Sequence, residues 1–298
     1  MISAAGLTKV YGGRTALDHA DFTVRPGVVT GFLGPNGAGK STAMRLILDL
    51  DRATAGSVTV NGRRYRDLPV PLREVGALLE AKAWHGGRSA HDHLRFLART
   101  NGIPKRRVRE VLDIVGLHDV AGKRAKSYSL GMGQRLGIAA ALLGDPAILM
   151  FDEPVNGLDP EGILWIRRLM QSLAAEGRTV FVSSHLMAEM ALTAGHLIVI
   201  GRGRILADTP MADFIPASHV RVRSPDLAAL VRAVAAEDWR ARPADDALLV
   251  YGVTPADVGD LAYRNGIRVH ELSPVHPSLE EAFMRLTADS VEYHGGGG

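Results

Sequence analysis

Residues 28–42 read Val28-Val29-Thr30-Gly31-Phe32-Leu33-Gly34-Pro35-Asn36-Gly37-Ala38-Gly39-Lys40-Ser41-Thr42, and this stretch decides the fold. Residues 28–33 are mostly apolar and rich in β-branched side chains, which predicts a strand buried on both faces. A glycine-rich loop follows directly, and helical periodicity then runs over 41–50. A buried strand that leads through such a loop into a helix indicates an α/β protein.

The loop matches the pattern G-x-x-x-x-G-K-[ST] between Gly34 and Ser41. Its glycines let backbone N–H groups turn toward phosphate oxygens, and the helix that follows adds its partial positive charge. Lys40 can reach the β and γ phosphates of a nucleotide, and the Ser41 hydroxyl can ligate Mg²⁺. The glycine order excludes the G-x-G-x-x-G pattern of dinucleotide sites. An ordinary glycine-rich turn is the alternative. The predicted nucleotide-binding residues are Gly34, Pro35, Asn36, Gly37, Ala38, Gly39, Lys40, Ser41 and Thr42.

Two carboxylates follow a second apolar stretch at 147–151, which is predicted to be a buried strand. Because the carboxyl ends of parallel strands meet on one side of a sheet, Asp152 and Glu153 are expected beside the glycine-rich loop. Asp152 can then hold Mg²⁺, and Glu153 can polarise an attacking water as a general base. Adjacent acids in a surface turn are the alternative, which the phosphate pattern in the same sheet disfavours.

A histidine follows a third stretch of this kind, the predicted strand 179–183. An isolated histidine is usually structural, but His185 is expected at the same end of the sheet, where it could contact the γ-phosphate or the attacking water. Glu153, His185 and Lys40 are therefore the predicted catalytic residues.

Composition limits the remaining possibilities. The chain has 298 residues, a formal net charge of +3 and no cysteine, which excludes disulfides, thiolate zinc sites and a cysteine nucleophile. The N-terminus does not read as a secretory signal, and the longest apolar tract, 136–144, is about half the roughly 20 residues of a membrane span. The basic run 105–110 favours a solvated helix face over a phosphate-binding patch.

The order of predicted elements indicates two domains. Residues 1 to about 95 are rich in strands, a helical segment occupies about 85–145, and strands then alternate with helices, which predicts a mixed, largely parallel sheet. After Pro216 a second α/β pattern begins, with strands expected at 219–223, 247–252 and 267–273 and helices at 226–236, 255–265 and 278–287. We therefore predict a nucleotide-binding domain over 1–216, a small accessory domain over 217–289 and a flexible tail over 290–298.

Together these features resemble the ATP-binding cassette (ABC) superfamily of transporter ATPases over residues 1–216. Tyr11 matches the aromatic residue that stacks on adenine in that family. Ser129-Leu130-Gly131-Met132-Gly133-Gln134-Arg135 matches the family signature, and Asn156-Gly157-Leu158-Asp159 matches the loop after the acidic strand. His185 matches the family's switch histidine.

Three residues depart from the usual family pattern. Leu130 stands where the signature normally has its first glycine, and Met132 stands where glutamine is usual. Glu80 occupies the place of a γ-phosphate-sensing glutamine and is a further candidate ligand of Mg²⁺. These variants and the accessory domain resemble the bacterial subgroup that serves drug and peptide-antibiotic exporters.

The resemblance implies a P-loop NTPase core that binds and hydrolyses ATP with Mg²⁺. It also implies a head-to-tail dimer, in which Ser129, Leu130, Gly131 and Met132 complete the site of the other chain, and a homodimer is favoured over a heterodimer. Glu80 and Asp159 would lie in switch loops. Hydrolysis would drive a separate membrane-spanning permease, so we expect a cytoplasmic location at the inner face of the membrane. The expected output is export of a drug, peptide or lipid-like compound.

Two alternatives remain. The first is a non-transport ABC ATPase acting on nucleic acid or ribosomes, whose coiled-coil insertion or second cassette the sequence does not contain. The second is a regulatory module that hydrolyses nothing, which the joint presence of Lys40, Ser41, Asp152, Glu153 and His185 disfavours. No nucleic-acid partner is expected.

Overall fold

The computed structural model describes residues 1–80 and 83–287, which form two compact units. The large unit comprises Met1–Met211 and also takes in residues 286 and 287, whereas the small unit comprises Ala212–Arg285. The tail predicted over 290–298 and the last residues of the predicted accessory domain lie outside the described residues.

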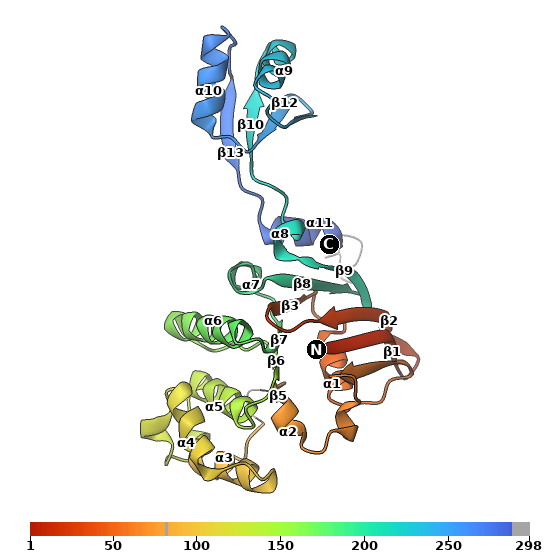
Figure 1. Ribbon diagram of the computed structural model, residues 1–298, viewed down its shortest axis with the longest axis vertical. Helices are drawn as coiled ribbons and strands as arrows, with labels where there is room; N and C mark the ends of the chain where they lie inside the picture. Colours follow the sequence, from red (N-terminus) through yellow and green to blue (C-terminus); the bar gives the residue numbers. More distant parts are fainter. Residues whose placement is uncertain (81–82, 288–298) are drawn as a thin grey trace, which may run out of the picture. The chain divides into compact units, whose positions relative to one another are not determined.

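A six-stranded sheet forms the centre of the large unit (Figure 1). In spatial order its strands are β5 (Val75–Leu78), β6 (Ile148–Asp152), β7 (Thr179–Ser183), β3 (Val29–Leu33), β8 (His196–Gly201) and β9 (Arg204–Pro210). All neighbouring pairs are parallel except the last, in which β9 runs antiparallel to β8. The predicted α/β fold with a largely parallel sheet is confirmed.

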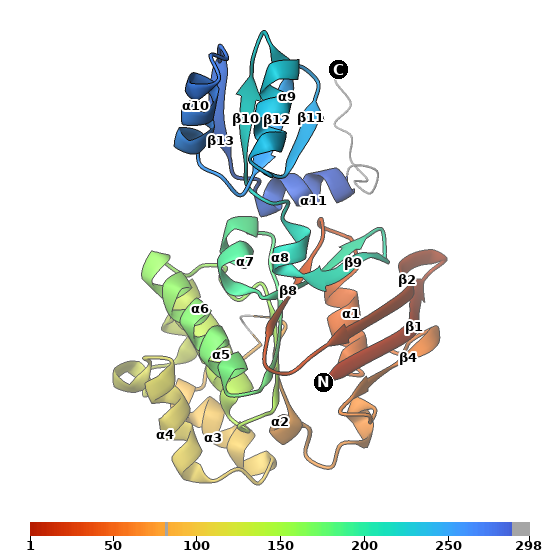
Figure 2. The same ribbon diagram turned by 45° about the horizontal axis from the view of Figure 1, so that its top comes forward.

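Helices cover both faces of this sheet. In Figures 1 and 2, α1 (Lys40–Ile47) lies on one face, while α5 (Leu130–Leu142) and α6 (Pro160–Ala175) lie on the other. Every residue of β3 and β7 is buried, which explains why these strands read as continuous apolar runs rather than alternating ones. Functional polar groups are thereby restricted to the ends of the strands.

A second sheet in the large unit is antiparallel and has the order β2 (Arg14–Val24), β1 (Ile2–Tyr11), β4 (Ala55–Val60). Its inner side shares one apolar core with α1 and the six-stranded sheet. Three phenylalanines mark this core, because the ring centroids of Phe22, Phe32 and Phe181 lie 5.1 to 6.2 Å apart.

The helical part of the large unit comprises α3 (Ala90–Thr100), α4 (Lys105–Ile114) and α5. Ser89 caps α3 by accepting a hydrogen bond from the Asp92 backbone at 3.0 Å, and Ser129 caps α5 by accepting one from Met132 at 3.2 Å. Shorter elements complete the unit: α2 (Pro71–Glu74), α7 (Met187–Thr193) and the 3₁₀ turns at Tyr65–Asp67, His118–Val120 and Ala125–Ser127. Helix α8 (Met211–Phe214) begins at Met211, and its remaining residues belong to the small unit.

The small unit contains a four-stranded antiparallel sheet in the order β11 (Ala241–Ala244), β12 (Ala247–Tyr251), β10 (His219–Arg223), β13 (Glu271–Val275). The helices α9 (Leu227–Ala236) and α10 (Pro255–Arg264) pack on one face (Figure 2), where Val220, Val222, Leu248 and Val250 meet them. Helix α11 (Leu279–Thr287) ends the described chain.

Two details of the small unit differ from the sequence prediction. Strand β11 is absent from the prediction, because Arg242 and Pro243 give it no apolar alternation. The strand predicted over 267–273 begins only at Glu271, since the Ile267 backbone N–H donates to Ala262 O at 2.9 Å and closes the end of α10 instead.

No helix within residues 1–80 and 83–287 combines the length and the apolar character that crossing a bilayer requires.

Candidate functional site

The glycine-rich loop connects β3 to α1 and lines a pocket of about 270 Å³. Gly37 and Gly39 have positive φ angles of 79° and 111°, a backbone conformation that favours glycine. At Gly39 a Cβ would also lie 2.6 Å from Ala16 O, so no other residue fits there without movement. Helix α1 has no side-chain cap and no acid in its first turn, which leaves its N-terminal N–H groups open toward the pocket.

Lys40 lies at the floor of this pocket and is 8% exposed. Its ammonium donates to Gly34 O at 2.6 Å and to Pro35 O at 3.3 Å. Burial lowers the pKa of Lys40, and the carboxylates of Glu153 and Asp152 partly oppose that shift. A cation in this place is suited to phosphate oxygens.

Ser41, in the first turn of α1, and Asp152, at the end of β6, both line the pocket and are in contact. The Ser41 hydroxyl donates to Asp152 Oδ2 at 2.8 Å, and the Ser183 hydroxyl donates to Asp152 Oδ1. A hydroxyl and a carboxylate are oxygen donors of the kind that Mg²⁺ prefers, so the chemistry of this pair fits that ion. Within the described residues, no group of three or more His, Asp or Glu side chains is arranged to hold a metal alone.

Glu153 directly follows β6, and hydrogen bonds from β7 and the chain beyond it hold it in place. Its backbone has a φ of 51°, in the left-handed region that non-glycine residues rarely adopt. The Glu153 N–H donates to the Ser183 hydroxyl at 3.0 Å and to Ser183 O at 3.2 Å. The His185 ring Nδ1 lies 2.7 Å from Glu153 Oε2, so the two predicted catalytic side chains are in direct contact.

Gln134 is a further functional candidate, which the sequence analysis placed in the signature motif without predicting a contact with Glu153. It is 1% exposed on α5, and its amide donates to the Glu153 carbonyl at 3.3 Å. The same carbonyl accepts from the Asn156 N–H at 3.2 Å. A glutamine among the apolar residues of a buried helix is a signal that could have singled it out, because a buried amide must find partners.

Other predicted residues lie apart from the pocket lining. The lining comprises Ala16, Asn36, Gly37, Ala38, Gly39, Lys40, Ser41, Thr42, Asp152 and Glu153. Tyr11 is 43% exposed and donates to Asp51 Oδ2 at 2.8 Å. Glu80 is exposed after β5, at the same end of the sheet as Asp152.

The signature residues begin α5 and pack against the loop that follows the acidic strand. Leu130 is 51% exposed, and its side chain occupies the space where a Cβ at Gly157 would lie, 2.3 Å from Leu130 Cδ2. Gly131 and Met132 follow in the first turn of the helix. In the same loop, Asp159 caps α6 by accepting a hydrogen bond from the Gly162 N–H at 2.9 Å.

Comparison with known families gives two matches. Residues 17–156 match the ABC transporter family, and residues 218–280 match a domain of unknown function named DUF8746. The chain is 35% identical over 298 residues to the bacitracin transport ATP-binding protein BcrA of Bacillus licheniformis, covering 96% of this chain and 97% of that protein. It is 37% identical over 210 residues to the lantibiotic transport ATP-binding protein SrtF of Streptococcus pyogenes, covering 70% and 90% of the two chains.

The fold is also similar to solved structures. One is the ATP-binding subunit of an ABC transporter, with a TM-score of 0.67, 27% identity and coverage of 72% of this chain and 91% of that one. A second is a dimeric cassette, MJ0796, bound to ADP and Pi, with a TM-score of 0.65, 23% identity and coverage of 71% and 99%. The named relatives are transport proteins, which agrees with a transporter subunit and not with the alternative of an ATPase acting on nucleic acid. The chain belongs to the ABC transporter family, in which it is an ATP-binding, ATP-hydrolysing subunit.

Proposed function

We propose that the pocket binds the phosphates of ATP, that Ser41 and Asp152 hold Mg²⁺ there, and that Glu153 is the general base. One observation carries the proposal. Ser41, Asp152, Glu153 and His185 come from segments far apart in sequence and lie in a chain of contacts no longer than 3.3 Å.

Each residue of the site would have a separate role in ATP binding or hydrolysis. Mg²⁺, when bound, would neutralise charge on the β and γ phosphates. Lys40 and the N–H groups of the loop would hold the same phosphates. Glu153 would accept a proton from the attacking water, and His185, in contact with Glu153 Oε2, would orient that carboxylate. Glu80 is a further candidate ligand, and Tyr11 is the candidate adenine contact.

The proposal extends to a dimer of identical subunits. Ser129, Leu130, Gly131 and Met132 are not among the residues that line the pocket of their own chain, and Leu130 is half exposed. We infer that this turn completes the site of a second copy across the dimer, because the partial positive charge at the N-terminus of a helix suits a γ-phosphate. Asp159 would lie in the adjoining switch loop.

We infer a separate membrane-spanning permease as the partner and export of a drug, peptide or lipid-like compound as the output. The names of the relatives support this class, since BcrA and SrtF are described as transporting bacitracin and a lantibiotic. A relative from Rhizobium is described as exporting Nod factor. The chain would then work at the cytoplasmic face of the membrane, with 1–216 as its ATPase domain and 217–289 as an accessory domain.

The experiment is hydrolysis and transport by the chain with its permease, in three forms: native, Glu153→Gln and Lys40→Ala. Glu153→Gln should bind ATP normally and hydrolyse it about 10²- to 10⁴-fold more slowly, because a proton acceptor is removed. Lys40→Ala should lose ATP affinity as well. Glu176→Gln, an exposed acid paired with Arg178, is the matched control. Normal hydrolysis by Glu153→Gln would refute the assignment of the base.

A further inference from the structure

The basic run on α4 has no part in the nucleotide site. The sequence favours a solvated helix face for it, yet the structure gives the two flanks of α4 different surroundings. One flank faces the loops that lead into the six-stranded sheet, and the other faces α3.

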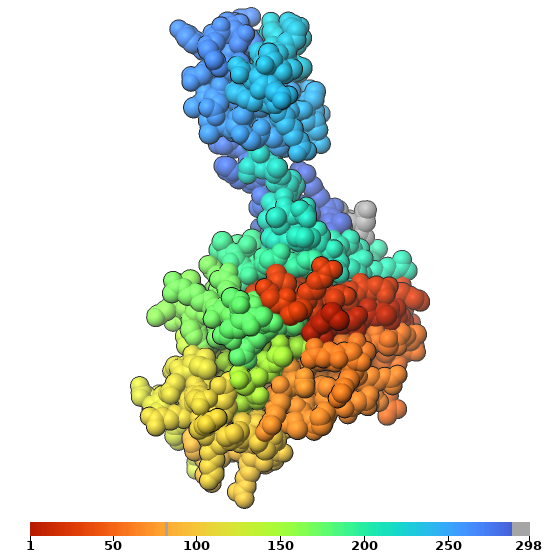
Figure 3. All heavy atoms as spheres, viewed as in Figure 1, coloured from red at the N-terminus to blue at the C-terminus, as the bar shows by residue number. Residues whose placement is uncertain are grey.

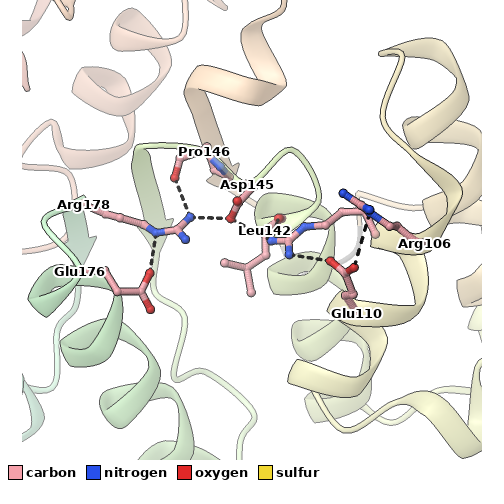
Figure 4. A network of polar contacts seen from close by, with 8 residues as sticks. Arg106, Glu110, Leu142, Asp145, Pro146, Glu176 and Arg178 are labelled. Carbon is pink, nitrogen blue, oxygen red and sulfur yellow. Dashed lines mark hydrogen bonds and ion pairs between the residues drawn. The ribbon is translucent and has the colours of Figure 1, made fainter.

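Carboxylates neutralise the first flank (Figure 4). Arg107 donates to Asp145 Oδ1 at 3.0 Å and to Glu110 Oε2 at 3.0 Å, and Arg106 lies 4.0 Å from Glu110 Oε1. Arg178 reaches the same Asp145 oxygen at 2.9 Å. These arginines tie α4 to the segments before β6 and β7, which gives their charge a structural role.

The second flank lines a groove of about 410 Å³ between α3 and α4. Arg95, Arg99 and Lys105 line it, and the lining contains no carboxylate. Its floor is apolar, since Ala98, Ile103 and Val108 are each at most 8% exposed. The groove lies in the part of the chain that Figure 3 colours yellow and shows at the molecular surface.

These three cations have no evident role in stabilising the fold. None of the three side chains forms an ion pair or hydrogen bond with another described residue. The last carbonyls of α3 are already satisfied without Arg99: Thr100 donates to Phe96 O, Asn101 to Leu97 O and the Ile103 N–H to Ala98 O. Lys105 begins α4, where the helix dipole favours an anion over a cation.

Helix α3, which supplies one wall of the groove, also carries an exposed aromatic residue. Phe96 is 48% exposed on α3, between the two arginines in sequence, and the Arg88 guanidinium lies 4.4 Å from its ring centroid. A helix that carries both basic side chains and an exposed aromatic residue is typical of segments that lie at a membrane interface. A water-exposed phenylalanine offers nothing to a small hydrophilic anion.

We propose that the groove between α3 and α4 binds the phosphates of acidic phospholipid headgroups, so that this chain contacts the membrane directly. The charge complementarity of Arg95, Arg99 and Lys105 with phosphate supports this partner. The apolar floor of the groove, together with the exposed Phe96 elsewhere on α3, favours a lipid over free phosphate. The inference does not depend on the proposed nucleotide chemistry.

The experiment is sedimentation of the full chain with phosphatidylcholine vesicles that contain or lack phosphatidylglycerol. The native chain should bind only the acidic vesicles and should be released by high salt, because exposed charges are screened. The triple variant R95Q/R99Q/K105Q should bind about 100-fold more weakly, since each cation near an anionic surface contributes roughly fivefold. Its ATP hydrolysis should match that of the native chain.

The matched control is R25Q/R168Q/R232Q, which removes the same number of charges from exposed sites elsewhere. It should keep most of the vesicle binding. Equal binding by the native chain and the groove variant, or equal losses in the two triple variants, would overturn the proposal. So would competition by inorganic phosphate or polyglutamate as strong as that by acidic vesicles. Should the triple variant misfold, R95Q and R99Q tested singly should each lose about fivefold.

Discussion

The two units use their sheets differently. In the large unit, β3 and β7 are buried along their whole length. The polar side chains of the candidate site lie at the carboxyl ends of the strands or directly after them, as Asp152 and Glu153 do. In the small unit, β10 alternates: Val220 and Val222 are buried, whereas Arg223 on the opposite face is exposed. The six-stranded sheet of the large unit therefore has its polar side chains at one end. The four-stranded sheet of the small unit has them along one face.

The connection of the strands explains this difference. Parallel strands need crossovers that cover both faces with helices, so loops at the carboxyl end are the only places left for function. An antiparallel sheet with helices on one face leaves the other face polar. We therefore expect a core substitution in one unit to destabilise that unit and to leave the stability of the other unchanged.

The largest expected effect is that of Phe181→Ala in the large unit. Removing the ring from the cluster with Phe22 and Phe32 should lower the free energy of unfolding by about 3–5 kcal/mol. Hydrogen exchange followed peptide by peptide should show faster exchange in β3 and β7 but unchanged exchange in β10 and β12. Faster exchange in both units would show that they unfold together.

Leu248→Ala is the matching change in the small unit. Leu248 is 1% exposed in the core under α9 and α10, so its truncation should cost about 2–5 kcal/mol there. Exchange should accelerate in β10 and β12, while the ATP hydrolysis rate of the chain stays the same. A parallel loss of hydrolysis would mean that the small unit supports the nucleotide site.

A smaller effect is expected from Gln134→Leu, which removes the amide that donates to the Glu153 carbonyl. The Glu153 backbone, and with it the carboxylate, should then be positioned less firmly. We expect kcat to fall about tenfold, which corresponds roughly to the free energy of one hydrogen bond, with little change in KM for ATP. Gln171→Leu is the control, since Gln171 also donates to a backbone carbonyl, that of Leu192 at 3.0 Å, but on the far part of α6. Equal kcat and KM values in the two variants would show that Gln134 does not position Glu153.

The smallest effect concerns pH. Burial lowers the pKa of Lys40, so its ammonium should lose its proton at a lower pH than an exposed lysine would. ATP affinity, measured without Mg²⁺, should fall severalfold as the pH rises through that value. Glu153→Gln removes a carboxylate that raises this pKa, and should therefore move the decline to lower pH. A profile that is flat up to the ordinary lysine range would contradict the inference.

Much of the fold and part of the site follow from local sequence. Residues 28–42 predict a strand, loop and helix, and the structure has β3 and α1 there with Lys40 at the start of the helix. The contact between Glu153 and His185 follows from parallel strands ending together, which the alternating pattern indicates.

What could not be predicted depends on contacts between distant segments or on backbone shape. The left-handed backbone of Glu153 and the bond it accepts from Gln134 appear only when β6, β7 and α5 are packed together. Strand β11 has no apolar alternation that could predict it, and it forms because its backbone pairs with β12. The charge asymmetry of α4 likewise requires knowing which flank faces Asp145 and which faces α3.

The left-handed conformation of Glu153 also matters to protein engineering. In that backbone region a residue with a Cβ is strained by about 1 kcal/mol or more, whereas glycine adopts it without steric strain. With the role proposed for Glu153, the carboxylate would favour activity while the backbone that carries it lowers thermal stability. An engineer who wants a sturdier, non-hydrolysing cassette should find Glu153→Gly more heat-resistant than Glu153→Gln, although the two lack the same acid.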